Sequence, residues 1–299
     1  MNLRYLIVVF LCAAPFLLHA QIDSLRKYEM KIKVLGDSML DSENQGTRLS
    51  AVFELIPTFQ KCIAFKGSFQ YPFDSLKFMT KLKSDDGLFR IYNWNVRFQD
   101  GSLRFYGAVQ FNPEQKKYPT KLIPLFDKAD KSDSLIAFQP LDHQNWYGAQ
   151  YYQLITKEVK TGFLRSLFRK EYRYTLIGWD GSPKKINRKI IEPLVIGRDG
   201  ELTFGAPYIH DLGQEQTVKL RKIFEYKKDA VMHLKYNPQK KAIVFDNLIP
   251  PNPANKGMTE TYVPEGTYDY FVYENGIWKR KYELFDSELS PADEMRQNR

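Results

Sequence analysis

The spacing of hydrophobic residues changes near Leu88, and this change limits the fold more than any other feature of the chain. Before it, apolar residues recur at intervals of three and four, as on one face of a helix. After it, apolar and polar residues alternate, as in a strand with one buried face. The first alternating apolar residues are Tyr92, Trp94, Val96 and Phe98. The sequence therefore predicts a mainly β fold with a short N-terminal helical part.

The helical part divides into two amphipathic stretches separated by the polar run 41–46. Because Pro57 lies within the second stretch, we expect that helix to be kinked or divided there. Two such helices would form a hairpin whose apolar faces cover another part of the molecule, since helices this short are unstable alone. The apolar stripes are Leu25, Tyr28, Ile32, Leu35 and Met39, then Leu49, Val52, Phe53, Ile56 and Ile63.

Pairs of turn residues punctuate the rest of the chain and predict an antiparallel meander. Asp-Gly and Asn-Gly pairs tolerate the positive φ angles of tight hairpins. They occur at 86–87, 100–101, 180–181, 199–200 and 275–276. Beyond the alternating stretch after Leu88, we expect strands at 102–111, 146–158, 171–179, 202–209, 219–226, 231–236, 241–248, 268–274 and 277–284. A propeller-like array, a sandwich and an open barrel are all compatible with this pattern.

The N-terminus has the order of a secretory signal peptide. Arg4 precedes the apolar run from Leu6 to Leu18, and Ala20 offers a small side chain before the expected cut. The run is shorter than a membrane-spanning helix requires. We expect an exported protein of the periplasm or the outer-membrane periphery, or one released from the cell. Its mature chain keeps one cysteine, Cys62, which we expect to be a buried apolar residue. The expected organisation is a signal peptide at 1–20, a helical segment at 21–84, an antiparallel β domain at 85–286 and a polar tail at 287–299.

Several stretches after the signal peptide resemble a family of secreted, β-rich proteins of Gram-negative bacteria to which no function is assigned. The resemblance spans most of the mature chain and implies export and one continuous β-rich unit. It implies no activity and no catalytic residues. The stretches are SFQYPFDSLKFMTKLKSDDGLFRIYNWN, WYGAQYY, YTLIGWDG, RKIFEYKKDAVMHLKYNPQKKAIVFDNLIP and VPEGTYDYFVYENGIWK.

Positive charge is concentrated between Lys157 and Lys189. This stretch has ten basic and three acidic residues, a net charge of +7, whereas the whole chain carries +9. Such a local field favours an anionic partner. For an exported protein we expect an anionic envelope surface or an acidic envelope protein, with peripheral membrane contact and no nucleic acid. The candidate binding residues are Phe163, Leu164, Arg165, Leu167, Phe168, Arg169, Lys170, Lys184 and Lys185, the first seven of which would form a basic, apolar interfacial helix.

An aromatic platform for sugar rings is the alternative site. It would use Trp94, Trp146, Tyr147 and Trp179, although such residues in a meander also fill cores. Carboxylates near predicted strand ends would then line a carbohydrate-binding or glycoside-cleaving cleft. They are Asp85, Asp86, Asp142, Asp180, Asp246 and Asp269.

The sequence contains no metalloprotease, calcium-loop, phosphate-loop or nucleophile-elbow motif. The pairs Asp142-His143 and His210-Asp211 place their side chains on opposite faces of any strand. We therefore expect no catalytic residue, metal or cofactor. The leading prediction is a non-enzymatic envelope protein that binds or scaffolds an anionic component or partner.

Overall fold

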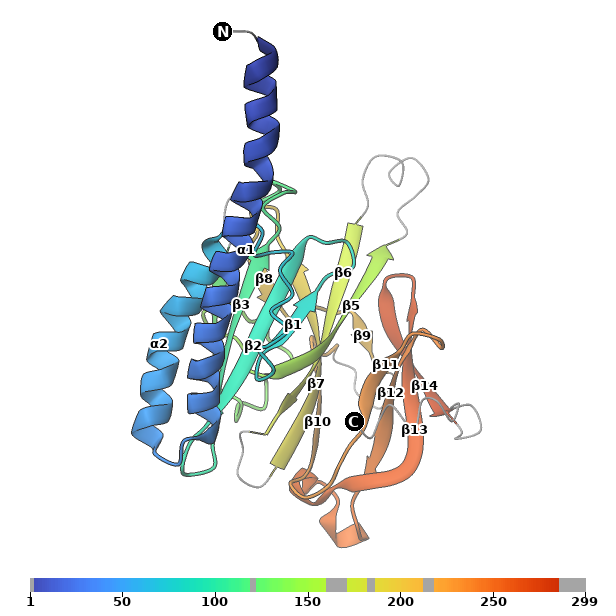
Figure 1. Cartoon of the computed structure of the whole chain (residues 1–299). Coiled ribbons are helices and arrows are strands. Elements are labelled where there is room, and N and C mark those ends of the chain that lie inside the picture. Colours follow the sequence, from blue (N-terminus) through green and yellow to red (C-terminus); the bar gives the residue numbers. More distant parts are fainter. Residues whose placement is uncertain (1–2, 119–121, 160–170, 182–185, 212–217, 285–299) are drawn as a thin grey trace.

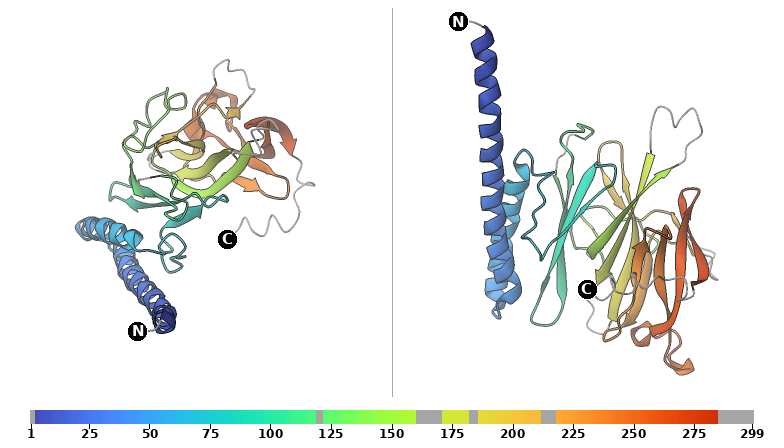
Figure 2. Two further views of the ribbon diagram at one scale, coloured as in Figure 1. Left: turned by 90° about the horizontal axis from the view of Figure 1, so that it is seen from above. Right: turned by 45° about the vertical axis from the view of Figure 1, so that its right-hand side comes forward.

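A computed structural model describes residues 3–118, 122–159, 171–181, 186–211 and 218–284. The structure is mainly β, and two N-terminal helices precede antiparallel sheets, which confirms the predicted fold class. The layers lie in the order helices, sheet 1, sheet 2, sheet 3 (Figures 1 and 2). The sheets are therefore stacked as in a sandwich, with one sheet more than a sandwich has.

The helical layer is a hairpin of α1 (Leu3–Asp41) and α2 (Gln45–Ala64). The predicted stripe of α1 is confirmed, since Leu25, Ile32 and Met39 are buried. The side chain of Asn44 caps α2 by accepting a hydrogen bond from the backbone N–H of Thr47. The first half of α1 extends away from the other layers (Figure 1). Within the described residues, no helix combines the length and apolar character needed to cross a membrane.

The buried face of α2 differs from the predicted one. Phe53 is 74% exposed, whereas Phe59 and Cys62 are buried. Pro57 does not divide the helix, which is continuous through it. In a regular helix, the N–H of residue 57 would bond the carbonyl oxygen of Phe53, and Pro57 has no N–H. Phe53 and Pro57 both lie on the exposed side, so this carbonyl faces solvent. The predicted division of the helix was therefore wrong.

Sheet 1 has the strand order β1-β2-β3-β4 and is buried on both faces of β2. Tyr92 and Trp94 face the helices, and Phe89 and Ile91 face sheet 2. Two short edge strands were not predicted, and β1 falls in the stretch expected to be helical. The bounds are β1 Thr80–Lys83, β2 Phe89–Arg97, β3 Leu103–Phe111 and β4 Leu122–Phe126.

Sheet 2 has the order β10-β7-β6-β5, and β8 also pairs with β7. The central strand β7 was not predicted because Pro193 breaks the sequence pattern. Pro193 lies where pairing with β10 ends at Ile191 and pairing with β8 begins at Leu194. The missing N–H therefore falls between two partner strands. The bounds are β5 Gln150–Val159, β6 Glu171–Asp180, β7 Ile186–Ile196, β8 Leu202–Phe204 and β10 Lys222–Lys227.

Sheet 3 has the order β11-β12-β13-β14-β9, in which only β9 and β14 pair in parallel. Two 3₁₀ turns, η1 (Pro253–Asn255) and η2 (Thr259–Thr261), lie between β12 and β13. The predicted turn at Asn275-Gly276 is confirmed, with positive φ at both residues. The bounds are β9 Ile209–His210, β11 Leu234–Asn237, β12 Ala242–Ile249, β13 Val263–Glu274 and β14 Ile277–Leu284.

Three hydrophobic cores separate the four layers. The helix core, around Phe59 and Trp94, lies between the hairpin and sheet 1. The central core, around Phe105 and Leu176, lies between sheets 1 and 2. The distal core lies between sheets 2 and 3, around Phe245. Sheet 2 thus contributes apolar side chains to two cores, which fixes its position firmly.

A buried ion pair holds the long connection between β4 and β5 against sheet 2. Arg221 and Glu192 are both fully buried, with 2.6 Å between Nε and Oε1. The guanidinium also donates to the carbonyl oxygens of Ile136, Gln139 and Phe204. Glu192 accepts a further hydrogen bond from the Tyr151 hydroxyl. Every charge in this pair is therefore neutralised and hydrogen-bonded inside the protein.

Glu29 fastens α1 to the segment that precedes sheet 1. Its carboxylate accepts hydrogen bonds from the Tyr71 hydroxyl at 2.6 Å and from the backbone and hydroxyl of Ser75 at 2.8 and 2.7 Å. Burial acts to raise the pKa of Glu29, but these hydrogen bonds and the charge of Lys81 outweigh it and leave the pKa lowered.

We expect this contact to make the hairpin acid-sensitive. A carboxyl group whose pKa is lowered by folding stabilises the folded state above its ordinary pKa, and this stabilisation is lost as the pH falls through the folded-state value. Glu29→Gln should reduce the free energy of unfolding at pH 7, and the difference from the parent should disappear below the lowered pKa. Denaturant unfolding measured from pH 7 to pH 2 tests this. A difference that stayed constant across that range would contradict it.

A tyrosine- and arginine-lined candidate site

The binding residues predicted from the basic segment lie outside the described residues. They are Phe163, Leu164, Arg165, Leu167, Phe168, Arg169, Lys170, Lys184 and Lys185. The strands on either side are described, and they pair up to Val159 and Glu171. The segment from 160 to 170 therefore joins β5 to β6 at this end of sheet 2.

The predicted aromatic platform does not form. Trp146 and Tyr147 are fully buried in the central core, and Trp94 is buried in the helix core on the other side of sheet 1. Trp179 is partly buried and packs against the central core. These side chains belong to two different cores because burying large aromatic surfaces between layers is favourable. The sequence pattern also allowed these residues to be core residues, and that is where the structure places them.

The predicted histidines and carboxylates are spread over the molecule rather than gathered in one cleft. His233 Nδ1 lies 3.3 Å from a carboxylate oxygen of Asp246, which is buried. Asp142 accepts hydrogen bonds from the backbone N–H groups of Gln144 and Asn145 and so caps a turn. In the part of the chain that the structure describes, no three potential metal ligands cluster.

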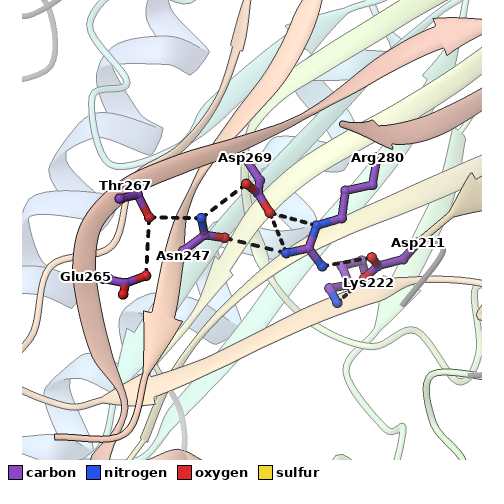
Figure 3. A network of polar contacts seen from close by, with 7 residues as sticks. All are labelled: Asp211, Lys222, Asn247, Glu265, Thr267, Asp269 and Arg280. Carbon is purple, nitrogen blue, oxygen red and sulfur yellow. Dashed lines mark hydrogen bonds and ion pairs between the residues drawn. The ribbon is translucent and has the colours of Figure 1, made fainter. Parts of the chain in front are cut away.

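Asp211 and Asp269 belong to a polar network that joins sheets 2 and 3 (Figure 3). Arg280 on β14 donates to Asp269 at 2.6 and 2.9 Å and to Asp211 at 2.9 Å. Asp211 is also paired with Lys222 on β10. These ion pairs outweigh burial and lower the pKa of Asp211. The carboxylates are occupied by structural contacts, which leaves them poorly suited to acid–base chemistry.

A cleft of about 550 Å³ lies at the end of sheet 2 where β6 begins and β7 ends. This volume is within the usual range for small-molecule sites. Its floor includes the buried side chains of Leu88, Tyr174 and Leu194. The remaining lining residues are Lys117, Tyr118, Glu171, Tyr172, Arg173, Val195, Ile196, Gly197, Arg198 and Tyr208. We call this the tyrosine cleft.

Neighbouring residues hold the aromatic rings of the tyrosine cleft in place. The Tyr118 ring lies 4.5 Å from that of Phe111 and packs against Gly200, where an added Cβ would approach it to 3.2 Å. The Arg173 guanidinium lies 3.9 Å from the centre of the Tyr208 ring and also donates to the carbonyl of Gly276. The cleft is therefore pre-organised, which reduces the entropy lost on binding.

Tyr174 anchors the floor of the same cleft. Its hydroxyl donates to a carboxylate oxygen of Asp86 at 2.7 Å, and its ring meets Phe89 edge to face. Burial, together with this hydrogen bond to Asp86, raises the pKa of Tyr174 well above its ordinary value. The Tyr174 hydroxyl therefore stays neutral at all physiological pH values, and the side chain is a fixed part of the cleft floor.

Positive charge dominates the tyrosine cleft. Lys117 and Arg198 are exposed on its walls, and within the described residues neither has a carboxylate partner. Arg173 adds a third positive charge, and Glu171 supplies the one carboxylate of the lining. The turn that carries Arg198 is the predicted Asp199-Gly200 turn, with φ of +88° at Gly200.

A second hollow, of about 590 Å³, has the opposite charge. It lies beside β4 and the same turn, and its lining includes Asp142, His143, Asp199 and Glu201. Three carboxylates would repel an anion there. Of the two hollows, the tyrosine cleft is the one that suits an anionic ligand.

Searches of protein-family models, curated proteins and solved structures found no match to this chain. The assignment of a site therefore rests on geometry and charge.

Sequence reasoning missed the tyrosine cleft because its residues come from distant parts of the chain. Tyr118, Tyr172 and Tyr208 are separated by dozens of residues and meet only when sheets 1 and 2 are stacked. One signal was present, since Arg173 lies within the basic stretch between Lys157 and Lys189. Residues at the start of β6, which belong to that stretch, line the cleft.

Proposed function

We propose that this protein is an exported, non-enzymatic binding protein of the cell envelope whose tyrosine cleft holds an anionic envelope component or an acidic part of a partner protein. The observation that carries this proposal is the positive charge of Lys117 and Arg198 on the cleft walls, for which the described residues provide no carboxylate partner. An anion placed between them would replace solvent as their partner.

The position of the basic segment supports the same proposal. The chain from 160 to 170 contains Arg165, Arg169 and Lys170, and its C-terminal neighbour Glu171 lines the cleft. Basic residues close to an anionic surface contribute about 1 kcal/mol each, and salt weakens that contribution. Because this segment directly precedes Glu171 in the chain, we propose that its basic residues and the cleft bind one partner.

We expect removal of the wall charges to weaken binding to anionic probes. The probes are phosphatidylglycerol vesicles, poly-L-glutamate and a uronic acid oligosaccharide, with phosphatidylcholine vesicles as the neutral reference. The double variant Lys117→Gln and Arg198→Gln should weaken binding of at least one anionic probe about tenfold at low salt. The triple variant Arg165→Ser, Arg169→Ser and Lys170→Ser should have an effect of the same size. Titration calorimetry and vesicle co-sedimentation measure the effect.

A matched control removes the same charge from another place. Lys66 and Lys256 are exposed and lie outside the cleft. Lys66→Gln combined with Lys256→Gln should leave binding within about twofold of the parent, since only screened long-range attraction is lost. If the wall and control variants lost affinity equally, the effect would come from net charge alone, which would contradict the proposal. The proposal would also be contradicted if no anionic probe bound.

A further inference from the structure

The tyrosine cleft contains three hydroxyl groups that have no hydrogen-bond partner among the described residues. Tyr118, Tyr172 and Tyr208 are half-buried, and their hydroxyls make no hydrogen bond to any residue in the described ranges. Some other tyrosines are hydrogen-bonded, since the hydroxyls of Tyr92 and Tyr152 donate to Gln110 and to the carbonyl of Leu234. The hydroxyls of Tyr147 and Tyr273 also have no described partner, but they are buried, whereas the three half-buried tyrosines line one hollow.

We infer that the ligand of the tyrosine cleft is an acidic saccharide, that is, a sugar unit carrying a carboxylate or phosphate group. This inference rests on the proposed function and names the chemical class of the anion. A tyrosine hydroxyl both donates and accepts a hydrogen bond, and so does each hydroxyl of a sugar. A carboxylate or a phosphodiester group only accepts hydrogen bonds, so it would use these hydroxyls as donors alone.

The rings of the cleft provide the second element of sugar recognition. The face of an aromatic ring is electronegative and attracts the positively polarised C–H groups of a sugar. Tyr118 is held by Phe111 and Gly200, and Tyr208 is held by Arg173, so both rings are fixed before a ligand arrives. Lys117 lies against the Tyr118 ring, with its Nζ 5.3 Å from the ring centre. A charged group is therefore placed beside an aromatic face.

The charges account for the acid group of the ligand. Arg198 presents a planar guanidinium that matches a carboxylate or phosphate in a two-point hydrogen bond. Lipid acyl chains fit this cleft less well, since its polar groups would lose water without gaining partners. An acidic peptide would pair with Lys117 and Arg198 but has no sugar ring whose C–H groups could pack on the tyrosine rings.

The test compares ligands that differ in one property. Trigalacturonate has sugar rings and carboxylates, its methyl ester has the same rings without charge, and N-acetylated, C-amidated triglutamate has the carboxylates without rings. Binding of each to the full mature chain is measured by titration calorimetry. We expect trigalacturonate to bind at least about tenfold more tightly than either reference ligand.

Single hydroxyl deletions separate the saccharide from the charge. Tyr118→Phe, Tyr172→Phe and Tyr208→Phe should each weaken trigalacturonate binding about threefold to tenfold, the loss expected for one hydrogen bond, and leave triglutamate binding unchanged. Tyr282→Phe is the control, because Tyr282 is 56% exposed and lies outside the cleft. Circular dichroism confirms that each variant is folded.

The outcomes distinguish the two proposals. Equal binding of triglutamate and trigalacturonate, sensitive to Lys117 and Arg198 but not to the tyrosine hydroxyls, would overturn the saccharide inference and leave the anion-binding function standing. Binding of vesicles alone would do the same. Equal binding of trigalacturonate and its methyl ester would overturn the requirement for an acid group. If no anionic probe binds, both proposals fail.

Discussion

Replacing Arg221 with methionine should destabilise the protein by about 3–5 kcal/mol, the cost of leaving a buried charge without its partner. Glu192 would remain fully buried with its negative charge, and the three carbonyl oxygens that Arg221 serves would lose their donor. Urea unfolding followed by tryptophan fluorescence measures the loss. Arg221→Lys should recover only part of it, since an ammonium group cannot reach all of these acceptors.

A surface ion pair provides the matched control for this change. Lys279 and Glu274 lie 3.3 Å apart, with their side chains 34% and 39% exposed. Lys279→Met should alter the free energy of unfolding by no more than about 0.5 kcal/mol, because solvent screens such pairs. If the two methionine variants were equally stable, the buried pair would not hold the β4–β5 connection as described.

Two phenylalanines in α2 should respond very differently to truncation. Phe59 is 2% exposed and meets the rings of Tyr92 and Trp94 at 5.0 and 6.0 Å, so Phe59→Ala should cost about 3–5 kcal/mol. Phe53 is 74% exposed, and Phe53→Ala should change stability by no more than about 0.5 kcal/mol. Guanidinium unfolding of both variants checks the pair. A comparable loss at Phe53 would show that its exposed ring is covered by something in solution.

The same two residues show where the sequence pattern reaches its limit. Helical spacing predicted that α2 has a buried stripe, and Val52 and Ile63 of that stripe are buried, but Phe53 was included wrongly and Phe59 was missed. Periodicity gives the angle of an apolar face only approximately, and the partner layer decides which neighbours are covered. The residues of sheet 1 that cover Phe59 lie more than thirty positions along the chain.

Strand prediction succeeded where turns were marked and failed where they were not. The Asp-Gly and Asn-Gly pairs correctly located several hairpins, including β13–β14. Strand β7 was missed because a proline in a strand normally excludes a central position. Only the tertiary arrangement, with one partner strand ending and another beginning beside Pro193, makes that position tolerable.

The candidate site was the least predictable feature. Composition predicted an anionic partner, and this stays a prediction. Among the described residues, Lys117 and Arg198 of the cleft have no carboxylate partner. The residues that line the cleft were not identifiable in advance, because Tyr118 and Tyr208 carry no local motif. The tryptophans that looked most suited to sugar binding are needed between the layers instead.

The order of the layers also affects how the chain folds while it is being synthesised. Each layer is built mainly from the stretch that follows the previous layer, so a chain emerging with its N-terminus first can assemble the hairpin and sheet 1 early. The far face of sheet 2, with Ile155, Ile177 and Ile191, waits for β11 to β14 to cover it. Until those last strands have been synthesised, that apolar face stays uncovered, and we expect chains that end before them to aggregate or to be degraded.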